Sequence, residues 1–91
     1  MIDVPLEQSL IEYPCDFPIK VMGLAQAGFR NAVIEIILRH DRQFQAASIA
    51  VKTSKHAKYL SLTCVVKALS REQLDNIYQE LCDHPLVVMV L

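Results

Sequence analysis

The side chains that could bind a metal or act as nucleophiles are few, and their spacing favours neither role. The chain has three cysteines and three histidines, at Cys15, Cys64, Cys82, His40, His56 and His84. No C-x-x-C pair occurs, no two histidines have the spacing of metal ligands, and three cysteines cannot hold an iron–sulfur cluster within one chain. Free cysteines are most often small buried apolar residues. We therefore expect buried structural thiols, no metal site and no cofactor.

The segment from Gly23 to Gly28 could bind an anion, because it precedes a helical pattern. Backbone amides near a helix N-terminus favour a carboxylate or a phosphate. Hydrolysis of the acylphosphatase kind would need an arginine inside the segment, whereas Arg30 comes after it, and no Lys-Ser/Thr pair follows Gly28 as in a P-loop. We expect a ligand site without catalytic residues, formed by Gly23, Leu24, Ala25, Gln26, Ala27 and Gly28.

A basic patch lies at Lys52, Lys55, His56 and Lys58. The formal net charge of −1 excludes a nucleic-acid binder held by bulk charge. Tyr59 is the only aromatic residue expected on the sheet face where RNA-binding folds display theirs. We expect a solvated hairpin here, with no nucleic acid. Weak binding of RNA or of another anionic partner through this basic patch is the alternative hypothesis for function.

The elements that must position these residues fit into one domain. A chain of 91 residues with 53% apolar content can bury a single modest core. Apolar periodicity predicts strands over residues 17–22, 47–53, 59–68 and 86–91, and helices over residues 26–40 and from the cap at Ser70 to His84. The second helix begins with an S-x-x-Q capping box, in which Ser70 is expected to accept a hydrogen bond from the Gln73 amide.

The order β-α-β-β-α-β predicts an α+β ferredoxin-like plait. In this fold a four-stranded antiparallel sheet has both helices on one face, with the first and third strands at its centre. Residues 15–91 form this single domain. Residues 1–14 form an N-terminal arm or a short helix starting at Pro5, either docked or frayed.

The expected last strand is apolar on both faces and carries neither charge nor proline, which is unusual for an edge strand. We expect an interface on the open face of the sheet, formed by Met22, Val65, Val87, Met89 and Leu91. The N-terminal arm could cover it with Leu6 and Leu10, or a partner protein or second copy could dock there. We favour a partner, because the arm has few apolar residues to offer.

The run Y-P-C-D-F-P-I-K-V-M-G, from Tyr13 to Gly23, resembles the start of the YbeD-like family of small uncharacterised bacterial proteins. The ending V-V-M-V-L resembles that family's C-terminus, so the resemblance covers about residues 11–91. The matching residues are Phe17, Pro18, Lys20, Val21, Met22 and Gly23. The resemblance implies a ferredoxin-like fold similar to the ACT-type regulatory domains of amino-acid metabolism, and it implies no catalytic site.

These observations predict a non-enzymatic regulatory or protein-interaction module. It is ACT-like, forms a homodimer or binds a protein partner, and can bind a small metabolite as effector. The longest apolar run, residues 86–91, is far too short to cross a bilayer, and no basic leader precedes an apolar stretch. We therefore expect no membrane association and a cytoplasmic location.

Overall fold

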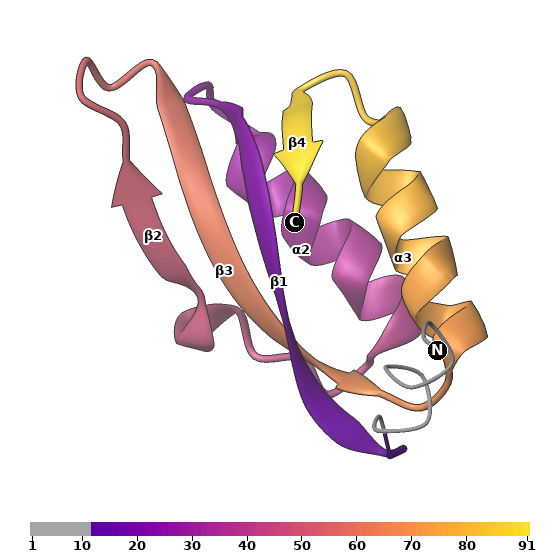
Figure 1. Ribbon diagram of the computed structural model, residues 1–91. Coiled ribbons are helices and arrows are strands. Elements are labelled where there is room, and N and C mark those ends of the chain that lie inside the picture. Colours follow the sequence, from indigo (N-terminus) through magenta and orange to yellow (C-terminus); the bar gives the residue numbers. More distant parts are fainter. Residues whose placement is uncertain (1–11) are drawn as a thin grey trace, which may run out of the picture.

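The computed structural model describes residues 12–91, which form a sheet with two helices packed on one face (Figure 1). The expected arm over residues 1–14 lies largely outside this range. Along the chain the elements are β1 (Cys15–Leu24), α2 (Phe29–His40), the short 3-10 helix η1 (Ala46–Ser48), β2 (Ala50–Thr53), β3 (Tyr59–Ala68), α3 (Arg71–Asp83) and β4 (Val87–Val90). No helix within residues 12–91 is long and apolar enough to cross a membrane.

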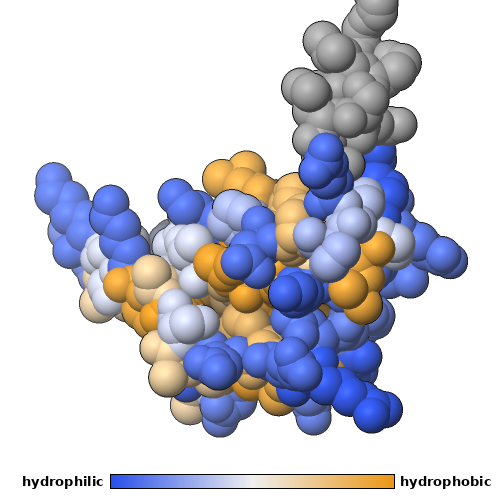
Figure 2. All heavy atoms as spheres, turned by 90° about the horizontal axis from the view of Figure 1, so that it is seen from below, coloured by the Kyte–Doolittle hydropathy of each residue, from blue (hydrophilic) through white to orange (hydrophobic). Residues whose placement is uncertain are grey.

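The sheet has the strand order β2-β3-β1-β4, and each neighbouring pair is antiparallel. This confirms the ferredoxin-like plait with the first and third strands at the centre. Strand β1 is longer than the expected residues 17–22, because every residue from Cys15 to Leu24 has a partner in β3. Short β2 projects to the left of the helices in Figure 1, and hydrophilic side chains extend at that end of the molecule in Figure 2.

The core lies between the sheet and the helices, where alternate residues of the two central strands meet the apolar stripes of α2 and α3. Its fully buried side chains include Ile19, Val21, Leu62, Cys64, Val66, Phe29, Val33, Ile37, Ile77 and Leu81. Cys64 is buried as expected. Cys82 is exposed, so the expectation of a buried thiol is wrong there. One residue after buried Leu81, its side chain is turned by about 100° around the helix towards solvent.

The two helices have different N-terminal caps. The expected capping box starts α3: the Gln73 amide donates to Ser70 Oγ at 3.1 Å. Helix α2 starts at Phe29, three residues later than expected, because Gly28 has a φ of 94° in the left-handed region and interrupts the helical geometry. Gly23 faces the Phe29 ring so closely that an added Cβ would lie 2.2 Å from Phe29 Cε1.

The second strand is shorter than the expected residues 47–53, because Ala46–Ser48 form a 3-10 turn. The Ser48 hydroxyl donates to the carbonyl of Gln45 at 2.7 Å, and the Arg30 guanidinium donates to the carbonyl of Ala46 at 3.1 Å. These bonds favour the turn over an extended backbone. Strand β2 therefore begins at Ala50.

The last strand contains an irregularity that alternation alone does not predict. Met22 pairs with Met89, but Gly23 pairs with Val87, so Val88 is an extra residue in β4. Such a bulge reverses the facing of the residues that precede it. Val87 therefore packs against the core. The expectation that Val87 lies on the open face of the sheet is wrong.

Candidate functional site

A depression on the open face of the sheet brings together residues from three strands. It has a volume of about 320 Å³ and lies where the β2–β3 hairpin meets β1. Its floor is mostly apolar, and its polar side chains are two lysines and four hydroxyl groups. The lining residues are Lys20, Met22, Lys52, Thr53, Ser54, Tyr59, Leu60, Ser61 and Leu91.

Strand register positions these side chains in two rows across the sheet. In the first row Lys52 pairs with Ser61, Ser61 with Met22, and Met22 with Met89. In the second row Ala50 pairs with Thr63, and Thr63 with Lys20. Lys20 and Leu91 exchange both backbone hydrogen bonds, at 3.1 and 2.8 Å, and this places Leu91 beside Lys20. Both rows face away from the helices, because the alternate residues fill the core.

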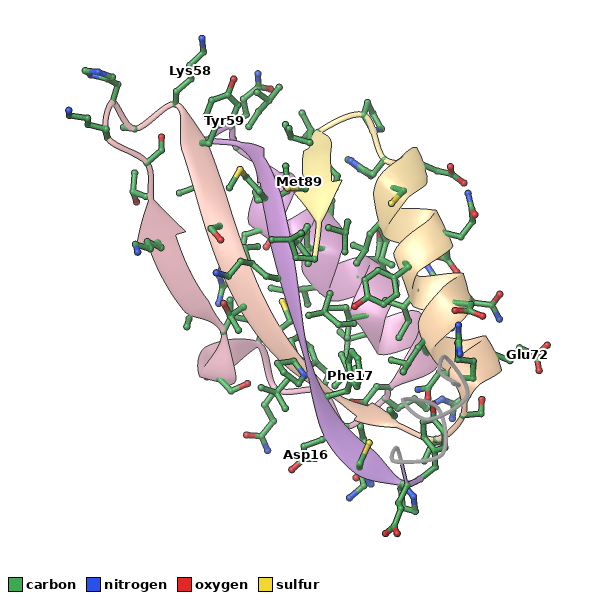
Figure 3. The ribbon with its side chains drawn as sticks, viewed as in Figure 1. Asp16, Phe17, Lys58, Tyr59, Glu72 and Met89 are labelled. Carbon is green, nitrogen blue, oxygen red and sulfur yellow. The ribbon has the colours of Figure 1, made fainter. Side chains whose placement is uncertain are left out.

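The hairpin that borders the depression is held closed by its own hydrogen bonds. The Ser54 amide donates to the Tyr59 carbonyl at 2.9 Å, and the Tyr59 amide donates to Ser54 Oγ at 3.0 Å. The Lys58 ammonium lies 5.8 Å from the centre of the Tyr59 ring, within the range of a cation–π interaction. Figure 3 shows these two labelled residues at the end of the sheet distant from Asp16.

The electrostatic character of this end follows from the sequence. Six of the nine lysines and arginines lie between Arg42 and Arg71, and none of the ten acidic residues does. Within that segment Lys52, Lys55 and Lys58 lie on β2 or in the hairpin. The depression is therefore bordered by positive charge, which favours an anion.

The expected basic patch is only partly in the depression. Lys52 lines it, whereas Lys55, His56 and Lys58 lie in the exposed connection between β2 and β3. Lys20 and Ser61 were absent from the sites expected from the sequence, and Leu91 was expected only in the interface on the open face. Ser61 lies opposite Lys52 in the β2–β3 pair, whereas Lys20 and Leu91 join the depression through the pairing of β1 with β3 and of β4 with β1, which local periodicity does not reveal.

The expected ligand segment from Gly23 to Gly28 has few free amides. Gly23 and Leu24 belong to β1, and Ala25–Gly28 form the corner before α2. The amides of Leu24, Ala25 and Gln26 donate to the carbonyls of Leu86, Lys58 and Leu24, at 3.0, 3.0 and 2.8 Å. Three donors of this corner are thus used internally. A ligand site there stays a prediction.

The expected interface residues are divided among different surroundings. Met22, Met89 and Leu91 are neighbours on the open face. Val65 lies further along β3 and lines another depression with Asp16 and Lys67. Val87 is on the core side of the sheet. An interface with a partner or second copy therefore stays a prediction for Met22, Met89 and Leu91, together with exposed Val65.

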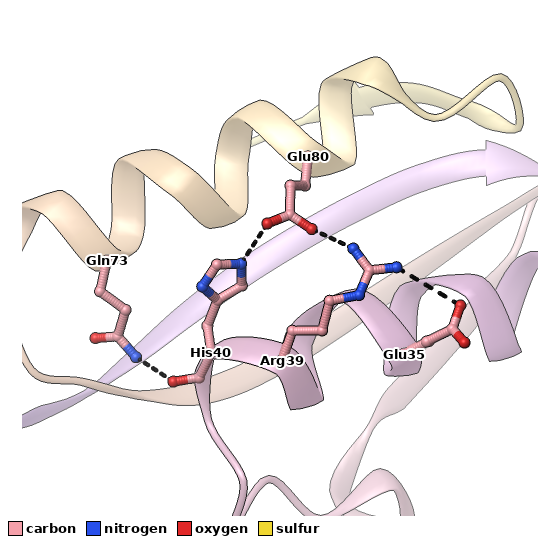
Figure 4. Close-up of polar contacts among 5 residues, drawn as sticks. All are labelled: Glu35, Arg39, His40, Gln73 and Glu80. Atoms are coloured by element: carbon pink, nitrogen blue, oxygen red, sulfur yellow. Dashed lines mark hydrogen bonds and ion pairs between the residues drawn. The ribbon is translucent and has the colours of Figure 1, made fainter.

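A polar network joins the two helices on the opposite side of the sheet (Figure 4). His40 Nε2 lies 2.6 Å from Glu80 Oε2, and Arg39 donates to the other carboxylate oxygen. The hydrogen bond from His40, with the positive charges of His40 and Arg39, lowers the pKa of Glu80. Gln73 Nε2 donates to the His40 carbonyl at 2.9 Å. This network links the end of α2 to α3, and among residues 12–91 no three His, Cys, Asp or Glu residues group as metal ligands.

Comparison with known proteins agrees with the fold and with the sequence resemblance. Residues 8–91 match the family model described as "Protein of unknown function (DUF493)". The chain belongs to the DUF493 family. A UPF0250 protein of Leptothrix cholodnii is 54% identical over the full length of both chains. A UPF0250 protein of Nitrosomonas europaea is 52% identical over 93% of this chain and 98% of its own. The expected membership of the YbeD-like family of small bacterial proteins is confirmed.

A solved structure of similar fold supports the architecture independently. The solution structure of protein HP0495 from H. pylori superposes with a TM-score of 0.74 at 24% sequence identity. The match covers 89% of this chain and 85% of that one. At this identity the likeness concerns the fold alone. The function of the DUF493 chain must be argued from its own residues.

Proposed function

We propose that this protein is a non-enzymatic regulatory module that binds a small organic anion in the depression on its open sheet face. One observation carries the proposal: Lys20 and Lys52 lie on opposite sides of a depression whose floor includes Met22, Leu60 and Leu91. Small-molecule sites are commonly concave, mostly apolar and supplied with a few convergent polar groups.

The lining residues suit a ligand that has both a carboxylate and an apolar part. The two ammonium groups can pair with the carboxylate, and the hydroxyls of Ser61 and Thr53 can hydrogen-bond to it. The apolar part would then contact the methionine and leucine side chains. A volume of about 320 Å³ is at the lower end of the range for ligand pockets, which favours a small metabolite.

The types of residue in the depression support binding without catalysis. Its lining includes no histidine, cysteine, aspartate or glutamate, the groups most used for acid–base and nucleophilic chemistry near neutral pH. The ferredoxin-like fold is similar to that of ACT-type regulatory domains, and this analogy supports a regulatory role. We also propose a cytoplasmic location, because the free thiols of Cys15, Cys64 and Cys82 suit a reducing compartment.

An NMR titration tests this proposal. We expect amino acids and small organic acids at millimolar concentration to shift the amide resonances of Lys20, Met22, Lys52 and Ser61. Lys20→Gln and Lys52→Gln should each weaken binding, because each removes one ammonium group. Lys67→Gln is a matched control, since Lys67 is an exposed lysine of the same sheet that does not line the depression.

Two outcomes contradict the proposal. Shifts confined to residues 23–28 would transfer the site to the corner before α2. The absence of shifts with every acid tested would leave the depression without a small-molecule ligand.

A further inference from the structure

Strand β2 presents a free hydrogen-bonding edge. It is the outermost strand on its side of the sheet, and no other strand within residues 12–91 pairs with its outer edge. All four residues from Ala50 to Thr53 are exposed. Val51 is 52% exposed although it is apolar, because neither helix extends under this strand (Figure 1).

The backbone groups that point away from β3 can be identified from the pairing. Ser54 donates its amide to the Tyr59 carbonyl, so Ser54 and Tyr59 form a hydrogen-bonded pair. Such pairs alternate with non-hydrogen-bonded pairs along an antiparallel ladder. Lys52 with Ser61 is therefore the next hydrogen-bonded pair, and the N–H and C=O groups of Val51 and Thr53 point outward from the sheet.

Positive charge lies on both sides of this edge. Lys52 is on the open face, Arg30 reaches the Ala46 carbonyl just before β2 from the helix side, and Lys55 and Lys58 follow in the hairpin. The segment from Arg42 to Arg71, which contains β2 and β3, has no acidic residue. The hydrophilic side chains extending at the left of Figure 2 lie at the end of the molecule that carries this hairpin.

We infer that the free edge of β2 binds an acidic extended segment of a partner protein as an added fifth strand. Main-chain hydrogen bonds to Val51 and Thr53 would supply affinity, and alternate side chains would supply specificity. On the open face, a residue beside Lys52 is best acidic. On the opposite face, a residue beside Val51 is best apolar. The recognised segment is therefore one in which acidic and apolar residues alternate.

A second copy of this chain does not suit the same edge. Pairing of β2 with β2 of another copy would join two segments that carry positive charge and no acidic residue between Arg42 and Arg71 in one sheet, so their charges would repel. An acidic strand replaces this repulsion by attraction. The inference does not depend on the ligand proposed for the depression, although Lys52 borders both sites.

The experiment measures binding of a fluorescein-labelled peptide of alternating glutamate and valine to the full-length protein by fluorescence anisotropy. A peptide of the same sequence, N-methylated on the residues that face β2, is the matched control probe, because it keeps the charge and removes the main-chain donors. We expect the unmodified peptide to bind about fivefold or more tightly than this control, the effect of at least one lost hydrogen bond.

Two variants of the protein test the edge itself. Val51→Pro removes an outward N–H without removing a bond to β3, and proline is tolerated at such edge positions. It should weaken binding about fivefold or more, whereas Val51→Thr, which keeps the N–H, should bind nearly as well as wild type. Lys20→Gln should leave peptide binding unchanged, and Val51→Pro should leave the binding of small acids unchanged, so the two proposals can fail separately.

Three results would overturn the inference. Equal binding of the N-methylated peptide would show attraction by charge without strand addition. Displacement of the peptide by single-stranded RNA at equal charge concentration would show a general polyanion surface. No measurable binding at low salt would show that the edge does not recruit acidic strands.

Discussion

His40 and Glu80 join the end of α2 to the last turn of α3 by a contact of 2.6 Å between Nε2 and Oε2. The imidazole is mostly buried, while the carboxylate is one-third exposed and also accepts a hydrogen bond from Arg39. Together with the hydrogen bond from Gln73 to the His40 carbonyl, this contact adds polar links to the apolar packing of α2 against α3.

The pH dependence of stability should report this contact. The pKa of Glu80 is lower in the folded state than in the unfolded state, chiefly because of the His40 hydrogen bond. The contribution of Glu80 to the stability of the fold is therefore fully present above its unfolded-state pKa and is lost as the pH falls through its folded-state pKa. Glu80→Gln should cost less than about 1 kcal/mol near pH 6. The free energies of unfolding of the wild type and of Glu80→Gln, measured with urea, should become equal as the pH falls to about 3. A difference between them that is the same at pH 3 as at pH 6 would contradict this assignment.

Gln73 should contribute more to stability than its place in a capping box suggests. Its Nε2 donates to the carbonyls of His40 and Lys67, at 2.9 and 3.2 Å, and its Oε1 accepts from the Leu69 amide. Gln73→Glu keeps the acceptor and removes both donors, so it should cost about 1–3 kcal/mol. Ser70→Ala should cost about 1 kcal/mol.

The control for Gln73→Glu is Gln79→Glu, which adds the same charge on an exposed face of α3. It replaces an exposed hydrogen bond from Gln79 to Asp83 by a like-charge pair, so it should cost about 0.5–1 kcal/mol. Chemical denaturation gives the free energy of unfolding of Gln73→Glu, Ser70→Ala and Gln79→Glu. Equal effects of the two glutamates would show that the donors of Gln73 contribute nothing.

Gly23 should not accept a side chain. A Cβ there would lie 2.2 Å from Phe29 Cε1 and 2.5 Å from the Leu86 carbonyl oxygen, which belongs to the backbone and cannot rotate away. Gly23→Ala should therefore destabilise the fold by about 1–3 kcal/mol. Gly28→Ala, which meets no atom within 4 Å but has positive φ, should cost about 1–2 kcal/mol from backbone strain alone.

Thermal unfolding combined with NMR separates these two effects. Gly23→Ala should shift the resonances of the Phe29 ring and of Leu86, whereas Gly28→Ala should leave them in place. If Gly23→Ala had wild-type stability and an unshifted Phe29 ring, the close packing of β1 against α2 would be wrong.

The thiols of Cys64 and Cys82 should differ sharply in reactivity. Burial raises the pKa of Cys64 to about 11, so little thiolate forms at neutral pH. Cys82 is exposed and should react with a thiol reagent in the native protein, whereas Cys64 should react only after unfolding. Mass spectrometry after labelling assigns the modified residue. Labelling of Cys64 as fast as Cys82 in the native protein would contradict the strand register of β3.

Met22 and Met89 pair on the open face beside exposed Leu91, and this small apolar surface carries the expectation of a homodimer. If a second copy docks here, Met89→Lys should weaken self-association with little effect on the fold. Sedimentation velocity of the wild type and of Met89→Lys measures self-association, and Val88→Lys is the control on the same strand. A wild-type protein that stays monomeric at high micromolar concentration would contradict the homodimer.

The sequence by itself determined the features that depend on neighbouring residues. Apolar periodicity placed both helices and the central strands, and it put Cys64 in the core. The S-x-x-Q spacing placed the start of α3 at Ser70. The order of elements then left the ferredoxin-like plait as the expected fold. Each of these features is local, or follows from rules that connect consecutive elements.

The tertiary structure decided the features that depend on pairing between distant segments. Only the pairing of β3 with β2 and β1, and of β1 with β4, places Lys20, Ser61 and Leu91 around the same depression as Lys52. The bulge at Val88 moved Val87 to the core, and the internal hydrogen bonds of Leu24, Ala25 and Gln26 used donors that the sequence left free. The alternation of apolar and polar residues in a strand determines which of them share a face. It does not determine which strand is the neighbour in the sheet, or where a bulge shifts the pairing by one residue. That choice belongs to the packing of the whole chain.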